Sequence, residues 1–276
     1  MLKKLMRDDR YYPFFALFCA LGWSLAYPFI KLGYGEFQIA QSDLGSKVLF
    51  AGIRFLFAGI LVLLFVLLRR HHLSVSRKSP WGLLLLFGLV NTALHYLFAY
   101  VGLSYLPSSR STILDSMNGF LLILMSCMIF ADDHMSLRKA LGCILGFAGI
   151  VLINLEPGEA MLAGISLRGD GLVLLNAFFG ALGGLLTRVV SKKMDMTTAT
   201  GISMTAGGGM LCLTAFVIGP SETWNITMKG IGILLVLILI SASCFGVYNL
   251  LLSYHPISKI ASETIGLRLK KIVAIT

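Results

Sequence analysis

Amide, imidazole and carboxyl side chains stand inside the long apolar runs of this 276-residue sequence, and their types could do chemistry. Asn91 and His95 are spaced i, i+4, and Asp115 and Asn118 are spaced i, i+3, so each pair would occupy one helix face. Polar side chains in an apolar medium are costly and mark candidate functional sites. The two faces predict a central cavity that binds a small molecule, with interhelical hydrogen bonding as the alternative role.

Arg54 and Asp115 carry opposite charges inside two different apolar runs. We expect the two charges to neutralise one another as an ion pair, which would act as a structural lock or as a proton-coupling site. A carboxyl group whose pKa changes with solvent access suits proton exchange. The alternative for Arg54 is a position near the outer interface, where a long side chain reaches the headgroups.

Trp23, Asn176 and Tyr248 complete the candidate binding residues. Aromatic side chains in such runs also pack against neighbours or sit at the membrane interface. A wall that mixes apolar and hydrogen-bonding groups suits an amino acid, a drug or a nucleobase-like molecule, and distinguishes none of them. The glycines Gly180, Gly183, Gly184 and Gly207–Gly209 are expected to serve helix packing.

Imidazole and carboxylate groups that invite a metal site lie in two connecting loops, at His71, His72, Asp132, Asp133 and His134. They lack the spacing of a dedicated site, so we expect solvated interfacial charge and no metal. The sequence contains no P-loop, HExxH or GxSxG motif. We therefore expect no cofactor, no catalytic residues and no enzyme activity. The five cysteines stand singly in apolar runs and indicate no disulfide framework.

The elements that must position these residues are membrane helices. Hydrophobic residues make up 57% of the chain and charged residues only 13%, which leaves too little polar surface for a soluble globule. A bilayer-crossing helix needs roughly 20 mostly apolar residues. The sequence predicts an all-α, polytopic integral membrane bundle with eight spans, at 12–32, 47–68, 81–104, 110–131, 137–155, 170–190, 196–219 and 231–253.

The cations alternate in phase with these spans. If the N-terminus is cytoplasmic, thirteen Lys and Arg residues fall on the inner side and four, Lys47, Arg110, Arg168 and Lys229, on the outer side. This positive-inside bias predicts a multi-pass protein of the cytoplasmic (inner) membrane with its N-terminus in the cytoplasm. The net charge is +10, but the Lys and Arg residues lie between the apolar runs and form no single polar face. We therefore expect no nucleic-acid partner.

One short segment occurs twice, as SYLPSSR at 104–110 and as SYHPISK at 253–259. The copies are 149 residues and five spans apart, so the second copy would be inverted in the membrane. Inverted repeats are the usual build of secondary transporters. We predict two inverted five-helix repeats, at 1–155 and 156–276. Coincidence is the alternative, because Ser, Tyr and Pro often mark helix ends.

The segment DDHMSLRKALGCILGFAGIVLIN at 132–154 combines an acidic corner, a Ser-x-x-Lys entry and glycines at 142, 146 and 149. It resembles the end of the first half in the drug/metabolite transporter superfamily, in its EamA-type members, and the resemblance extends over about 12–260. It implies ten transmembrane helices in two inverted halves and secondary active transport of small metabolites or drugs. The implied partners are a small-molecule substrate, the lipid bilayer, a proton or counter-solute, and a second copy in a homodimer.

The twenty residues after Pro256 depart from this family pattern. Glu263, Arg268, Lys270 and Lys271 interrupt their apolar run, and central cations cost about 2.5–3.5 kcal/mol each on insertion scales. We expect this tail not to cross, so that the ninth helix is partial and the tenth is missing. Two interpretations of this tail remain open. The chain is either a product truncated or frame-shifted after about Ser262 or a family variant with eight or nine helices.

The predicted function is secondary active transport of small organic metabolites or drugs, with alternating access between the inverted repeats. One alternative is an integral-membrane enzyme that uses Asp115 and His95 for acid/base chemistry. Others are a membrane scaffold without transport activity and a non-functional truncated transporter fragment. The inverted duplication favours the carrier, because an enzyme needs no such repeat.

Overall fold

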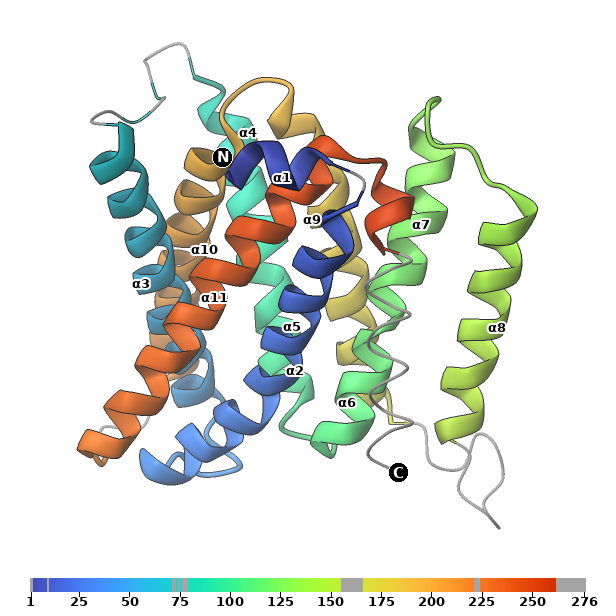
Figure 1. Ribbon diagram of the computed structural model, residues 1–276. Helices are drawn as coiled ribbons and strands as arrows, with labels where there is room; N and C mark the ends of the chain where they lie inside the picture. Colours follow the sequence, from blue (N-terminus) through green and yellow to red (C-terminus); the bar gives the residue numbers. More distant parts are fainter. Residues whose placement is uncertain are drawn as a thin grey trace.

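The computed structural model describes residues 2–8, 10–70, 73, 75, 79–154, 166–220 and 224–261, and all the regular structure in this part of the chain is helical (Figure 1). The helices lie roughly side by side as one bundle. In chain order the elements are α1 Leu2–Arg7, α2 Tyr12–Glu36, α3 Leu44–Arg70, α4 Trp81–Gly88, η1 Leu89–Leu94, α5 His95–Gly102, α6 Ser108–Asp115, α7 Met117–Ile129, α8 Leu137–Asn154, η2 Leu167–Gly171, α9 Leu172–Ser191, α10 Met196–Ile218 and α11 Met228–Tyr254.

The predicted all-α membrane bundle is confirmed. Six of the predicted spans are helices that are long and apolar enough to cross a bilayer, at Tyr12–Glu36, Leu44–Arg69, Trp81–Gly102, Leu167–Ser191, Met196–Ile218 and Met228–Tyr254. The other two predicted spans contain shorter apolar helices. The fourth span is divided at Ser116 into α6 and α7, and α8 forms the fifth span. The chain is a multi-pass membrane protein.

The i, i+4 pairing of Asn91 and His95 presupposes that the third span is one regular α-helix. The structure differs from this expectation. The middle of this span, η1 at Leu89–Leu94, is π-helical and contains Asn91. A second π-helical turn, η2, precedes α9. π-Helical turns inside α-helices are frequent at functional sites. Hydrophobic periodicity cannot reveal such a turn, since the surrounding residues are apolar on all sides.

Helices α3 and α10 pack closely together and join the first and second halves of the chain. Gly52 and Gly59 on α3 face Gly201 and Gly208 on α10, and a Cβ atom at these positions would meet the facing helix. A Cβ at Gly208, for example, would overlap the backbone of Leu56. In lipid, small residues let helix backbones pack where no hydrophobic effect drives association. The glycines therefore hold the two halves together.

The two copies of the repeated segment form corners at opposite ends of the bundle (Figure 1). Corner 1, Ser104–Arg110, follows α5, and corner 2, Ser253–Lys259, begins in the last two residues of α11. Pro107 and Pro256 each precede a new helical turn. Five spans lie between the copies, as the inverted placement requires. The predicted boundary between repeats, at 155/156, lies outside the described residues. So does the tail at 262–276.

Candidate functional site

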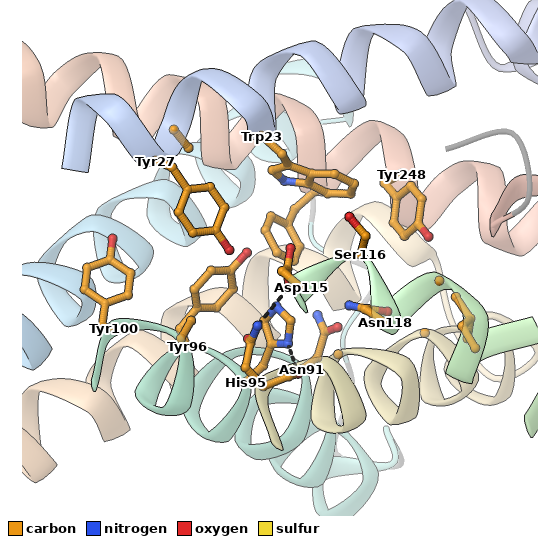
Figure 2. A pocket seen from close by; sticks show the side chains of 18 of the residues that line it. Trp23, Tyr27, Asn91, His95, Tyr96, Tyr100, Asp115, Ser116, Asn118 and Tyr248 are labelled. Carbon is orange, nitrogen blue, oxygen red and sulfur yellow. Dashed lines mark hydrogen bonds between the residues drawn. The ribbon is translucent and has the colours of Figure 1, made fainter. Parts of the chain in front are cut away.

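A cavity of about 90 Å³ lies in the centre of the bundle, where it has room for several waters or one small solute. Helices from both halves of the chain line it. In Figure 2, Trp23 and Tyr27 of α2 face His95 and Tyr96 across this cavity. The structure brings all the sequence-predicted candidates to it, namely Trp23, Arg54, Asn91, His95, Asp115, Asn118, Asn176 and Tyr248.

Asp115, Asn176 and His95 form a hydrogen-bonded group that joins α6, α9 and α5. The Asn176 side-chain amide donates to Asp115 Oδ1 at 2.7 Å, and His95 Nδ1 lies 2.9 Å from the backbone carbonyl oxygen of Asn176. A carbonyl oxygen only accepts, so Nδ1 carries the proton in this contact. In the neutral imidazole the other nitrogen, Nε2, is then a hydrogen-bond acceptor.

Two glycines of α9 make room for this polar group. A Cβ at Gly180 would overlap Asn118 Nδ2 and the His95 ring, and a Cβ at Gly183 would overlap Asn91 Oδ1. Their spacing in the sequence predicts a role in helix packing. In the structure, the polar side chains of the opposite helices lie directly against the α9 backbone.

Arg54 corrects a prediction. Its Nε donates to Ser241 Oγ at 2.7 Å and its Nη1 donates to Tyr100 Oη at 3.0 Å. Among the described residues its hydrogen bonds go to these neutral groups, so the expected ion pair with Asp115 is wrong. The alternative position at the interface is also wrong, because Arg54 is only 1% exposed. The hydrogen-bond partners of Arg54 depend on which helices lie next to α3. The order of the spans along the chain does not show which helices those are.

Aromatic rings form much of the remaining wall. Trp23 packs edge-on against Tyr248, with ring centroids 4.8 Å apart, and against Phe245 at 5.8 Å. On the facing wall, Tyr96 contacts Phe55 at 4.0 Å and His95 at 4.5 Å. The two Trp23 contacts and the Tyr96–His95 contact are edge-to-face, a geometry that aromatic pairs prefer, and the Tyr96–Phe55 contact is tilted. The cavity therefore has a mainly apolar, aromatic wall with a few polar groups.

Two asparagines of the cavity wall each have a buried polar atom without a hydrogen-bond partner in the described part of the chain. These atoms are Asn91 Nδ2, a donor, and Asn176 Oδ1, an acceptor. Asn91 is 6% exposed and Asn176 is 1% exposed. An unsatisfied buried polar group is costly, so a bound solute or water that paired with them would be favoured.

Several cavity or supporting residues were not among the predicted site residues. Ser116 lines the cavity, and Ser241 holds Arg54. Asn249 donates to Thr200 Oγ1 at 3.0 Å and accepts from Thr187 Oγ1 at 3.4 Å, which ties α11 to α10 and α9. Asn249 could have been found from the sequence, because it is an amide in an apolar run. Serine carries no such signal, because it is common in membrane helices.

Asp133 corrects the expectation of solvated loop charge. It is 2% exposed and accepts hydrogen bonds from Ser126, from Lys139 Nζ at 2.9 Å, and from the Ser258 hydroxyl and amide. Burial alone would raise the pKa of this carboxyl, but the hydrogen bonds outweigh burial and lower the pKa to about 2. Its neighbour Asp132 is exposed and pairs with Arg188. His71 and His72 lie outside the described residues.

The family model described as the EamA-like transporter family matches residues 11–155 and 167–263. The uncharacterized transporter YvbV of Bacillus subtilis is 28% identical over 259 residues, which are 93% of this chain and 80% of YvbV. The uncharacterized transporter sll0355 of Synechocystis is 30% identical over 230 residues, 78% of this chain and 68% of sll0355.

One solved crystal structure has a similar fold at low sequence identity. It superimposes with a TM-score of 0.71 at 14% identity, and the match covers 97% of this chain and 89% of the other. At this identity the likeness concerns the fold alone. It extends over nearly the whole helical bundle.

Proposed function

Because the chain belongs to the EamA-like transporter family, we propose that it is a secondary active transporter that carries a small organic solute across the cytoplasmic membrane. The observation that carries this proposal is the central cavity, whose polar and aromatic wall comes from both halves of the chain. Carriers built from inverted repeats bind their substrate where the halves meet. The family also favours the carrier over the intramembrane enzyme considered from the sequence.

Alternating access would use the two corners, because each corner binds the other half of the chain. Arg110 of corner 1 pairs with Asp170, which precedes α9, at 2.9 Å. Ser258 of corner 2 binds Asp133, which precedes α8, through its amide at 3.1 Å. Opening the cavity toward one end would break the tie at that end. The repeats at 1–155 and 156–276 would be the two bodies that rock.

The distribution of cations supports an orientation with the N-terminus in the cytoplasm. Corner 2 and Asp133 would then lie at the cytoplasmic end, and corner 1 and Asp170 at the outer end. Asp115 is our candidate for proton coupling, since it is a carboxyl group in the cavity itself. A counter-solute is the alternative source of driving force.

The experiment is flux in proteoliposomes, measured with a panel of labelled amino acids and drugs, with and without an imposed pH gradient. We expect at least one solute to move, and Asp115→Asn to lose the response to the gradient. The matched control is Asp132→Asn, which neutralises an exposed carboxylate outside the cavity. Flat traces for folded wild-type protein across the panel would contradict transport. A gradient response that survives in Asp115→Asn would contradict the coupling role alone.

A further inference from the structure

Arg54 is a buried cation in the cavity wall, and its charge is not compensated by a carboxylate of the described residues. It lies ten residues into α3 and is 1% exposed. Moving a charge out of water is expensive unless a partner of opposite charge is present. The hydroxyl groups of Ser241 and Tyr100 are neutral, so they orient the guanidinium without cancelling its charge.

The guanidinium has hydrogen-bonding capacity left over. Arginine has five N–H donors in a planar fork. One donor on Nε and one on Nη1 are used, while Nη2 makes no hydrogen bond to the described part of the chain. The planar fork matches the two oxygens of a carboxylate better than a single point charge would. Nη1 and Nη2 together can therefore still receive a bidentate anion.

The surroundings hold this fork in one orientation. The guanidinium carbon lies 5.0 Å from the centre of the Phe55 ring, which favours a cation over its face. Tyr100 Oη accepts from Nη1 on one side and Ser241 Oγ accepts from Nε on the other. A fixed donor loses less conformational entropy on binding than a mobile one. The site is thus built before the ligand arrives.

Asp115 lines the same cavity, so the cavity carries one positive and one negative side chain. Asp115 accepts from Asn176, whereas Arg54 binds only hydroxyl groups. A dianion would meet one cation and one carboxylate in this small space, and its second charge would be repelled. A monoanion would be neutralised by Arg54 alone. The charge distribution favours a carboxylate over a phosphate.

We propose that Arg54 is the anion-binding residue of this cavity and that the transported solute is an organic monocarboxylate with an aromatic or apolar body. The body would lie against the aromatic wall formed by Trp23, Tyr96 and Phe245. This inference names the substrate class of the cavity, and it rests on the proposed transport function.

The test uses full-length protein in detergent and three probes that differ only in their head group: phenylacetate, phenylacetamide and phenethylamine. Binding is measured by calorimetry, with thermal unfolding as a check on folding. We expect wild type to bind the acid at least about tenfold more tightly than the amide or the amine, since hydrogen bonds to charged groups are the strong ones. Phenyl phosphate, a dianion near neutral pH, should bind more weakly than phenylacetate.

The variants are Arg54→Gln, Arg54→Lys and the matched control Arg168→Gln, which removes an exposed arginine outside the cavity. Arg54→Gln should bring the ratio of acid to amide affinity close to one. Arg54→Lys should keep part of the preference, because it retains the charge and loses the fork. Arg168→Gln should behave as wild type. If Arg54→Gln does not fold, Arg54→Lys and the three probes on wild type still decide.

Two results would overturn the proposal: an unchanged acid preference in folded Arg54→Gln, or no acid preference in folded wild type, including failure to bind the acid at millimolar concentration. Flux of a neutral or cationic solute in proteoliposomes, together with no acid preference, would overturn this inference and leave the proposed function standing. Binding of the acid without flux of any solute would contradict the proposed transport function and leave Arg54 as the anion-binding residue of the cavity.

Discussion

Corner 1 and corner 2 share residue types at five of seven positions, yet their ends of the bundle are held together in different ways. Corner 1 closes through an ion pair between Arg110, whose side chain is 31% exposed, and Asp170, whose side chain is 6% exposed. Corner 2 closes around Asp133, whose side chain is 1% exposed and accepts from Ser126, Lys139 and Ser258.

This difference concerns how easily each end would open. An ion pair with one partly exposed partner contributes little, typically up to about 1 kcal/mol, because water already solvates that partner in part. A buried carboxylate that loses its donors is left with an uncompensated charge, which costs several times more. The end at corner 2 is therefore the more firmly closed one in this conformation. The same seven-residue pattern does not imply the same strength.

The largest effect should come from Asp133→Asn. The change removes the charge that holds Lys139 and replaces one acceptor oxygen by a donor that faces Ser258. We expect a loss of about 3 kcal/mol in the free energy of unfolding, measured by denaturant titration in detergent. Asp132→Asn, at the exposed neighbouring carboxylate, is the control and should cost less than about 1 kcal/mol. Equal losses in the two variants would remove the contrast between the corners.

A smaller effect is expected from Asp170→Asn at corner 1. The variant loses the ion pair with Arg110 but keeps an oxygen that can accept from the Ser166 amide. We expect a loss of about 1 kcal/mol or less, because the Arg110 side chain that loses its partner is partly exposed and stays solvated. The measurement is the same denaturant titration. A loss as large as that of Asp133→Asn would show that the two ends are closed equally firmly.

The smallest effect should come from pH in the neutral range. The Asp133 carboxyl has its pKa lowered to about 2 in the folded protein, while an unfolded Asp titrates near about 3.9. Its contribution to stability is complete above the unfolded value and is lost as pH falls from about 4 toward about 2. The stability difference between wild type and Asp133→Asn should thus stay constant between about pH 5 and 8. A difference that changes steadily across that range would contradict this assignment.

Much of the cavity could be predicted from residue types. Asn91, His95, Asp115, Asn118 and Asn176 are polar residues in apolar runs, and the cost of leaving such groups in lipid directs them toward the protein interior. Their convergence on one cavity follows from that cost. It does not depend on details of helix packing, so a sequence is sufficient to anticipate it.

The partners of these residues could not be predicted. Arg54 binds Ser241 and Tyr100, which are 187 and 46 residues away along the chain. Its expected partner, Asp115, bonds to Asn176. Hydrogen bonds act over about 3 Å, so a shift of one helix relative to another changes every partner. Gly180 shows the same limit, because its neighbours Asn118 and His95 come from two other helices.

The positions of the long spans and the phase of the flanking cations follow from residue order alone, because transfer into lipid is a sum over residues in a short window. The repeated corner likewise indicates that one helix end recurs with the opposite direction in the membrane. The three-dimensional arrangement decided the rest: the partners of Arg54, the π-helical turn at Asn91, and the burial of Asp133 by Ser258. These features depend on contacts between segments far apart in the chain, and local hydropathy carries no information about which helices meet.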